Sequence, residues 1–130
     1  MRFVKKPIPV LVEFASTAGE IQSLEGPVRY APGDALMTGA AGEHWPISRI
    51  RFEATYDPVP PTHMGENGIY LKKRILIEAR QATQEERISL AEERGILIAR
   101  AGDWVVTAPD GHEWVVANDI FLETYEVAER

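Results

Sequence analysis

One stretch of this chain occurs twice, and the repeat restricts the possible folds more than any other feature of the sequence. The first copy covers residues 33–57, the second covers residues 102–126, and the two align without a gap. Eight positions are identical in both copies: Gly33/Gly102, Asp34/Asp103, Thr38/Thr107, Gly42/Gly111, Trp45/Trp114, Phe52/Phe121, Thr55/Thr124 and Tyr56/Tyr125. Most of these residues are turn formers and aromatics, which serve a repeated fold rather than repeated chemistry. The repeat therefore predicts two similar structural units.

The hydrophobic pattern predicts short strands throughout both halves. Apolar and β-branched runs that end at glycine or proline are typical of strands. The strands expected in the first half are 8–14, 28–30, 35–38, 44–47 and 55–59. Those expected in the second half are 75–79, 96–99, 104–107, 113–116 and 124–127. Between the halves, the proline-rich segment 57–68 is expected to be partly extended and then to turn.

Two capping boxes predict helices between the strands. In a capping box, a Thr and the Glu three residues later each bond the other residue's backbone N–H. The two boxes are Thr17 with Glu20 and Thr83 with Glu86. They predict helices at 18–24 and 84–94, the second being the longer. A short helical turn is also expected near the end of each half, capped by Ser48 in the first and by Asn118 or Asp119 in the second.

These elements define an α+β fold that is predominantly antiparallel β. Each unit is expected to run strand, helix, β hairpins, short helix, strand. The expected boundaries are 1–59 for the first unit, 60–68 for the linker and 69–130 for the second unit. A unit of about 60 residues has a marginal core by itself, so packing around a pseudo-twofold axis would bury more apolar surface.

Composition excludes several classes of function. The chain has no cysteine, so disulfides, thiolate catalysis and cysteine zinc sites are ruled out. The net charge of −6 argues against a general nucleic-acid binder, although it allows an acidic protein that binds a basic partner. No apolar run approaches the roughly 20 residues of a membrane-spanning helix. The N-terminal segment is interpreted as a strand rather than a signal peptide, which predicts a cytoplasmic protein with no membrane partner.

Two small basic clusters occupy equivalent places in the two halves. Lys5 and Lys6 form the first cluster, and Lys72, Lys73 and Arg74 form the second. We interpret them as solvated strand ends that discourage edge pairing, in preference to a phosphate-binding patch.

The sequence resembles a family of small phage-encoded and bacterial proteins with a Pro-Gly-Asp-aromatic motif. The resemblance rests on PGDALM and AGDWVV, on the endings FEATY and FLETYE, and on the start KKPIPVLVEF. It covers most of both halves, so the chain resembles a tandem duplication of that unit. It implies a fold unit and no activity, because such proteins are functionally uncharacterised. The chain departs from the pattern at Ala35, at Ala101 and at His112-Glu113.

Two His/Glu pairs are the first candidates for chemistry. Glu43 with His44 and His112 with Glu113 lie in equivalent hairpins, where each pair could supply a general base or a metal ligand. Adjacent strand residues point to opposite faces, so the members of a pair are not expected to converge. We therefore favour exposed polar positions. His63 lies in the linker without metal-ligand spacing, and neither a metal nor a cofactor is expected.

Asp103 and Trp104 complete the list of candidates. Asp34 and Asp103 could form an acid pair, one from each unit, but Gly-Asp is common in turns and we interpret both as turn residues. Trp104 has only Ala35 as its counterpart, which makes it the best candidate for an exposed aromatic contact.

The leading hypothesis from the sequence is a non-enzymatic binding or structural accessory protein of phage or prophage type, with a protein partner or self-association. The first alternative is a small-ligand-binding protein or hydrolase-type enzyme with a site between the two units. The second is an acidic protein that mimics nucleic acid, which would require carboxylates clustered on one face.

Overall fold

The computed structural model describes residues 1–128, and these residues form mainly antiparallel strands. Two short α-helices accompany the strands, α1 at Arg49–Thr55 and α2 at Asn118–Thr124. The strands of the two largest sheets pair antiparallel. The prediction of a predominantly antiparallel β fold with short helices is therefore confirmed.

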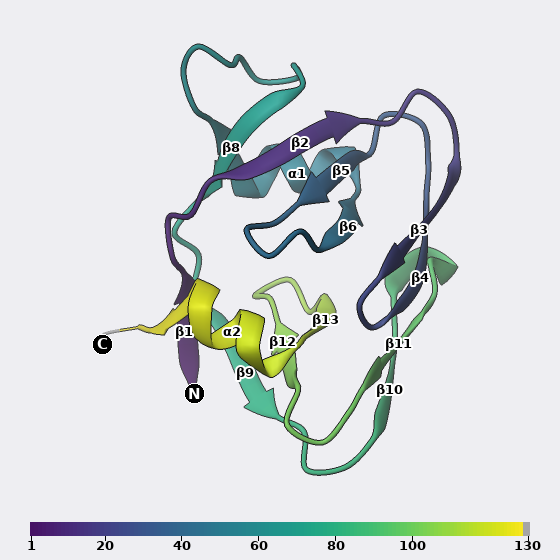
Figure 1. Cartoon of the computed structure of the whole chain (residues 1–130), viewed down its shortest axis with the longest axis vertical. Helices are drawn as coiled ribbons and strands as arrows, with labels where there is room; N and C mark the ends of the chain where they lie inside the picture. The colour runs from purple at the N-terminus through teal and green to yellow at the C-terminus, as the bar shows by residue number, and fades with distance from the viewer. Residues whose placement is uncertain (129–130) are drawn as a thin grey trace. The chain divides into compact units, whose positions relative to one another are not determined.

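The chain divides into two compact units, each built from segments that are separate in the sequence. Unit 1 consists of Met1–Lys6, Leu24–Pro27 and Arg74–Arg130, and unit 2 consists of Pro7–Ser23 and Val28–Lys73. Each unit contains one five-stranded sheet and one α-helix (Figure 1).

The sheet of unit 2 has the strand order β6-β5-β2-β8-β7. Its strands are β2 (Val10–Phe14), β5 (Ala35–Thr38), β6 (His44–Ile47), β7 (Tyr56–Pro58) and β8 (Gly68–Lys72). Helix α1 supplies Phe52 to the core, where its ring stacks on Tyr56 and meets the edge of Tyr70. The buried core residues are Val10, Val12, Ala35, Met37, Phe52, Tyr56 and Tyr70. Because strand side chains alternate between faces, every second residue of β2 faces this core.

The sheet of unit 1 has the strand order β13-β12-β9-β1-β14. Its strands are β1 (Arg2–Lys5), β9 (Ile77–Gln81), β12 (Trp104–Thr107), β13 (Glu113–Val116) and β14 (Tyr125–Val127). Helix α2 places Phe121 between the rings of Trp104 and Tyr125, and Phe3 packs edge-on against Phe121. The buried core residues are Phe3, Ile77, Ala79, Val106, Phe121 and Tyr125.

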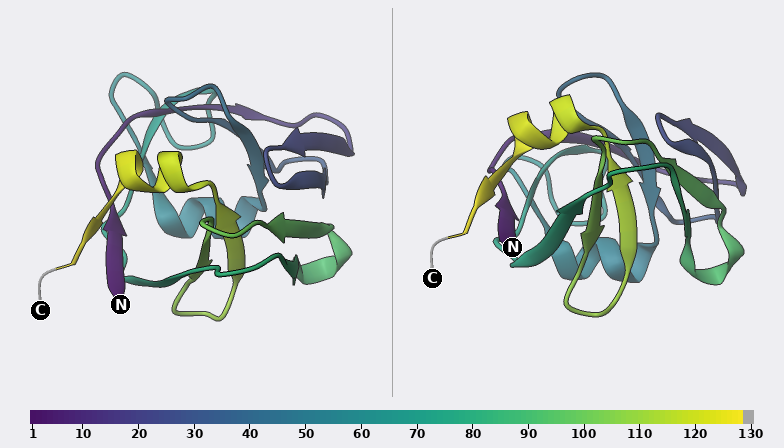
Figure 2. Two further views of the ribbon diagram at one scale, coloured as in Figure 1. Left: turned by 60° about the horizontal axis from the view of Figure 1, so that its bottom comes forward. Right: turned by 90° about the horizontal axis from the view of Figure 1, so that it is seen from below.

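Both helices predicted from capping boxes are wrong, because each segment forms a hairpin. The first hairpin consists of β3 (Gly19–Ser23) and β4 (Gly26–Tyr30). The second consists of β10 (Glu86–Ser89) and β11 (Ile96–Ala99), with a short 3₁₀ turn, η1 (Ala91–Glu93), at its tip. Figure 2 shows this second hairpin extending from the sheet of unit 1.

The carboxylate of Glu86 explains why the second capping box fails. Both of its oxygens accept hydrogen bonds of 2.8 Å from the guanidinium of Arg80 on β9. Pairing also buries Ile88 and Leu97, which lie opposite each other in the hairpin. A bidentate ion pair and buried apolar contacts therefore replace the local capping bonds.

The predicted helix caps also need correction, although both short helices occur where they are expected. Ser48 is the N-cap residue of α1, but its side chain makes no capping hydrogen bond. The N-cap residue of α2 is Ala117, not Asn118 or Asp119. Asp119 instead accepts a hydrogen bond from the adjacent N–H of Ile120 at 2.9 Å.

The strand predictions at the start of each half also differ from the structure. The N-terminal segment forms two strands, β1 and β2, that belong to different sheets. After the linker, residues 68–72 form β8, which was not predicted, and the strand predicted at 75–79 lies two residues later as β9. An alternating apolar pattern shows which side chains face the core. It does not show which strand lies alongside, so the sequence does not reveal whether an apolar run forms one strand or is divided between two sheets.

Candidate functional site

The two aspartates of the Gly-Asp repeat stabilise tight turns. A carboxylate oxygen of Asp34 accepts a hydrogen bond from the Ala31 N–H at 2.9 Å, and one of Asp103 accepts from the Arg100 N–H at 3.0 Å. The glycine that precedes each aspartate has positive φ, 88° at Gly33 and 98° at Gly102. Each aspartate therefore makes the side-chain bond to backbone that the sequence predicts for a turn residue.

In the first hairpin, Glu43 and His44 bond to different groups. The His44 Nδ1 lies 3.1 Å from the hydroxyl of Thr38 on the neighbouring strand. The Glu43 carboxylate accepts a hydrogen bond from the Ala41 N–H at 3.0 Å, across the turn. The two side chains therefore support the hairpin separately.

In the second hairpin, His112 and Glu113 are separated in the same way. The His112 Nδ1 lies 3.1 Å from a carboxylate oxygen of Asp110, and both side chains are about half exposed, at 45% and 53%. Glu113 accepts a hydrogen bond from the Thr107 hydroxyl at 3.2 Å. The contact between His112 and Asp110 therefore lies within the turn that precedes β13.

Trp104 is half-buried and packs against the core of unit 1. Its ring stacks on Phe121 with 4.2 Å between centroids and meets Phe3 edge-on at 5.6 Å. Its indole N–H donates a 2.9 Å hydrogen bond to the side-chain oxygen of Asn118, the first residue of α2. Trp104 therefore fastens the start of α2 to the sheet, while the corresponding Ala35 in unit 2 is fully buried.

The basic clusters lie beside the closing strands of the two sheets. The ammonium groups of Lys5 and Lys72 lie 5.7 and 5.5 Å from the ring centroids of Tyr125 and Tyr56, respectively. Lys73 also pairs with Asp57 at 3.8 Å. Three of the five basic residues therefore have specific partners near strand ends. Within residues 1–128, no group of three or more histidine or acidic side chains is arranged to hold a metal ion.

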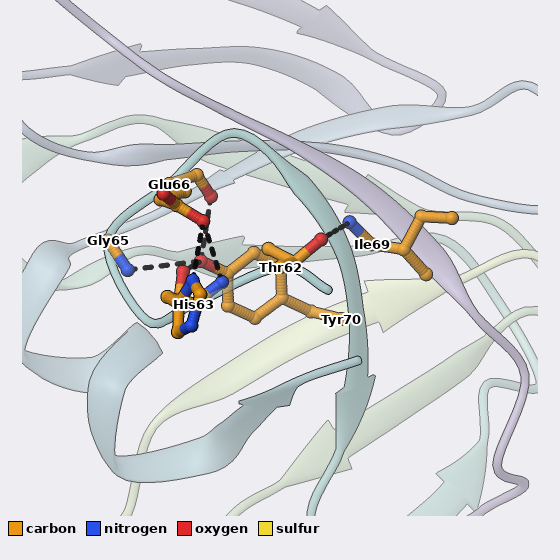
Figure 3. Close-up of polar contacts among 6 residues, drawn as sticks. All are labelled: Thr62, His63, Gly65, Glu66, Ile69 and Tyr70. Carbon is orange, nitrogen blue, oxygen red and sulfur yellow. Dashed lines mark hydrogen bonds and ion pairs between the residues drawn. The ribbon is translucent and has the colours of Figure 1, made fainter. Parts of the chain in front are cut away.

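Sequence reasoning missed the role of Tyr70, which anchors the loop predicted as a linker (Figure 3). The fully buried ring lies in the core of unit 2, and its hydroxyl reaches the loop backbone. The hydroxyl is 2.7 Å from the carbonyl oxygen of Glu66 and 3.1 Å from that of His63, and it accepts a bond from the Gly65 N–H at 3.1 Å. The sequence signal is a tyrosine at a buried strand position, where a phenylalanine would fill the core equally well.

The charged side chains of this loop bond within it. The carboxylate of Glu66 accepts a 2.8 Å hydrogen bond from the His63 N–H and lies 3.2 Å from the His63 Nδ1. The backbone bond, followed by the side-chain bond, lowers the pKa of Glu66. Hydrogen bonds among its own residues therefore hold the loop, which turns and bends at residues 64–67, close to where the sequence predicts a turn.

An apolar pair is exposed on the face of the unit 2 sheet opposite its core. Leu11 on β2 lies directly across from Ile69 on β8, and their exposed fractions are 57% and 40%. In the sheet of unit 1, the neighbouring strands β1 and β9 carry a charged pair, Arg2 opposite Glu78. The alternation in VLVEF marks Leu11 as an outward residue, but the sequence alone does not show that Ile69 is its partner.

Comparison with known protein families identifies the group to which this chain belongs. A family model described as "PGDYG protein" matches residues 26–126, which include both Gly-Asp turns. The chain belongs to the PGDYG family. Both Gly-Asp pairs, Gly33-Asp34 and Gly102-Asp103, form turns within the matched residues. No curated protein and no solved structure matches the chain.

Neither α1 nor α2, nor any other helix formed by residues 1–128, is long and apolar enough to cross a membrane.

Proposed function

We propose that this PGDYG protein is a non-enzymatic binding protein that docks a protein partner on the outer face of the unit 2 sheet. The observation that carries the proposal is the exposed pair of Leu11 and Ile69. Cross-strand apolar pairs normally stabilise a sheet by packing against a second layer. Within the described residues, the exposed pair of Leu11 and Ile69 has no such covering layer, and a protein partner would supply it by packing on the sheet.

The residues around the pair have the composition of a small interface. Half-buried Leu36 lies on β5 and half-buried Leu71 on β8, and their cross-strand partners are Glu13 and Asp57. An apolar centre with charged neighbours is the usual anatomy of a non-obligate protein interface. We define the docking face as Leu11, Glu13, Leu36, Asp57, Ile69 and Leu71.

The charge of the chain favours a basic partner over a second copy. With a net charge of −6, two copies of the chain repel each other at separations up to about a Debye length. A basic protein is attracted over the same range. The carboxylates of Glu13 and Asp57 would lie at the rim of the contact. They are therefore expected to affect the association rate more strongly than the dissociation rate.

A photo-crosslinking experiment tests the docking face in cells that express the protein. A photoreactive phenylalanine analogue at Leu11 should give a discrete crosslink to one basic protein. Adding Ile69→Arg should abolish that crosslink while the circular dichroism spectrum stays native. Ile50 provides a matched control, because it is an apolar residue of α1 that is 85% exposed. Equal crosslinking from both positions would refute the docking face, and a crosslink to a second copy would identify self-association instead.

We also propose that the chain is a tandem duplication of one β-rich unit, related by a pseudo-twofold axis. Matched backbone bonds support this proposal. In unit 2, the Ala15 N–H donates to the Asp34 carbonyl at 2.9 Å. In unit 1, the Ala82 N–H donates to the Asp103 carbonyl at 2.7 Å. The helices match as well, since α1 and α2 each have seven residues and lie between a hairpin and the closing strand. An experimental structure in which the two sheets, with their helices, do not superimpose would refute the duplication.

A further inference from the structure

The loop before Tyr70 divides the sequence into two halves, and each half contributes one strand to the sheet formed mainly by the other half. The sheet of unit 1 takes β9, β12, β13 and β14 from the second half and β1 from the first. The sheet of unit 2 takes β2, β5, β6 and β7 from the first half and β8 from the second. Each sheet therefore contains four strands of one half and a single strand of the other.

Both exchanged strands lie inside their sheets rather than at an edge. Strand β1 pairs with β9 on one side and with β14 on the other, so its removal would leave β14 without a neighbour. Strand β8 lies in the same way between β2 and β7. A strand in this position makes ladder hydrogen bonds on both sides, and its loss exposes two sheet edges.

The exchanged strands also complete the two cores. Phe3 and Val4 of β1 are 6% and 1% exposed, and Phe3 contacts the rings of Trp104 and Phe121. Tyr70 of β8 is fully buried in the core formed by residues of the first half. Because burial of a large aromatic side chain removes much apolar surface from water, each core depends on a residue from the other half.

The chain passes from one sheet to the other through two short connections. Residues 6–9 join β1 to β2, and residues 73–76 join β8 to β9. The first residue of each connection is fixed in the same manner. Lys6 N–H donates to the Thr124 carbonyl and Lys73 N–H donates to the Thr55 carbonyl, at 2.7 and 2.8 Å. These bonds hold each exchanged strand at the point where α2 or α1 leads into the closing strand.

We infer that each half of this chain presents a strand-wide interaction surface whose partner is the other half. The first half accepts an apolar strand between β2 and β7, and Gly68–Lys72 occupies that place. The second half accepts a strand between β9 and β14, and Arg2–Lys5 occupies it. The two halves therefore bind each other by reciprocal strand exchange, independently of any contact at the docking face.

Cleavage of the folded full-length protein tests this inference. A protease recognition sequence is inserted between Met64 and Gly65, in the exposed loop, and the protein is cut after folding. The two fragments should elute together at the size of the uncut protein and keep its circular dichroism spectrum. They should separate only in denaturant. Separation in native buffer into two folded species would overturn the inference.

A pair of variants assigns the association to the exchanged strands. In the cut protein, Phe3→Ala should raise the dissociation constant of the two fragments at least tenfold, because it removes the aromatic contacts of β1. Ile50→Ala, at an exposed site of the first half, should change it less than twofold. Equal dissociation constants for the two variants would assign the association to contacts other than strand exchange and would overturn the inference. Uncut Phe3→Ala serves to verify that the variant folds.

Discussion

Tyr70 acts through both ends of its side chain. The ring meets Phe52 at 4.8 Å in the core, and the hydroxyl bonds to the backbone of the loop that follows β7. The core and the loop of unit 2 are therefore connected through one residue. A buried tyrosine that satisfies its hydroxyl in this way keeps the apolar contribution of the ring without leaving a polar atom unpaired.

Replacing Tyr70 by phenylalanine separates these two contributions. We expect Tyr70→Phe to lower the free energy of unfolding by about 1 kcal/mol, the usual net value of a hydrogen-bonded hydroxyl. Amide exchange at Gly65 should accelerate, since its N–H loses its acceptor. Urea unfolding and hydrogen exchange measure the two effects. Unchanged exchange at Gly65, compared with Gly42 in the hairpin turn, would contradict the anchoring role.

Tyr125 gives the protein a specific sensitivity to alkaline pH. Burial raises the pKa of Tyr125 to about 12, against a smaller opposing effect of a hydrogen bond from Trp114. Because the folded pKa exceeds the unfolded value of 10.0, the protonated phenol stabilises the fold at neutral pH. This contribution is complete below pH 10 and decreases as the pH rises toward 12.

A spectroscopic titration checks this expectation. Tyrosinate absorbance should contain a component with a midpoint near pH 12, and Tyr125→Phe should remove it. The free energy of unfolding should fall between pH 10 and 12, by at most roughly 1.4 kcal/mol for each pH unit by which the folded pKa exceeds the unfolded one. The free energy of unfolding of Tyr125→Phe should fall less steeply over the same range. Identical titrations of the variant and the parent would show that Tyr125 is not the tyrosine that ionises near pH 12.

At the residue scale, the sequence predicts the local bonds well and the distant ones poorly. The turns stabilised by Asp34 and Asp103 follow from the Gly-Asp dipeptide. His112 and Glu113 bond to different partners, but His112 lies before β13, in the turn with Asp110, so the two-residue period of a strand does not explain its contact. The anchoring by Tyr70 depends on where a loop folds back, which no local pattern encodes. The exposure of Leu11 opposite Ile69 similarly depends on strand register.

At the element scale, the hairpins in place of helices show how tertiary pairing overrides local preference. The segment at Glu86 has the Thr-x-x-Glu spacing of a helix start, yet it pairs with β11 and buries Ile88. Five strands, by contrast, have the predicted bounds: β5, β6, β11, β12 and β13. Four of these five form the tight hairpins of the internal repeat, where glycine-containing turns define the ends of the strands.

The connection between β10 and β11 contains strain that a substitution can relieve. Glu92 and Glu93 have φ values of 61° and 54°, in the left-handed region that costs an ordinary residue about 1 kcal/mol. We expect Glu93→Gly to raise the free energy of unfolding by up to about 1 kcal/mol. Glu123→Gly, at an exposed position of α2, should lower it by a similar amount. Thermal unfolding measures the stability of the two variants. Destabilisation by Glu93→Gly as well as by Glu123→Gly would contradict the left-handed backbone conformation at Glu93.

At the scale of the whole molecule, strand exchange brings the two ends of the described chain together. Phe3 lies opposite Val127 in the ladder, and the Ala128 N–H donates to the Arg2 carbonyl at 3.0 Å. These partners are separated by more than 120 positions of the sequence. Pairing between such distant segments is slow to form, because the chain loses loop entropy before the contact stabilises it.

Joining the two ends removes that entropic cost and should make the protein both more stable and faster to fold. Because Arg2 and Ala128 are hydrogen-bonded, a chain cut to residues 1–128 can be closed by a linker of about four Gly/Ser residues between Ala128 and Met1 without distorting the sheet. The chain-entropy model sets a ceiling of about 5 kcal/mol for closing a ring of this size, and strain in the linker will reduce the gain. Refolding should accelerate, since the pairing of β1 with β14 becomes local.

The comparison for this experiment is a linear chain that carries the same linker residues at its C-terminus. Urea unfolding and stopped-flow refolding of the cyclic and linear forms measure stability and rate. Cyclisation acts on the unfolded chain and on the folding barrier, so the unfolding rate should change much less than the refolding rate. Equal refolding rates would show that β1 joins its sheet after the barrier, and a less stable cyclic form would place the ends further apart than the bond between Ala128 and Arg2 allows.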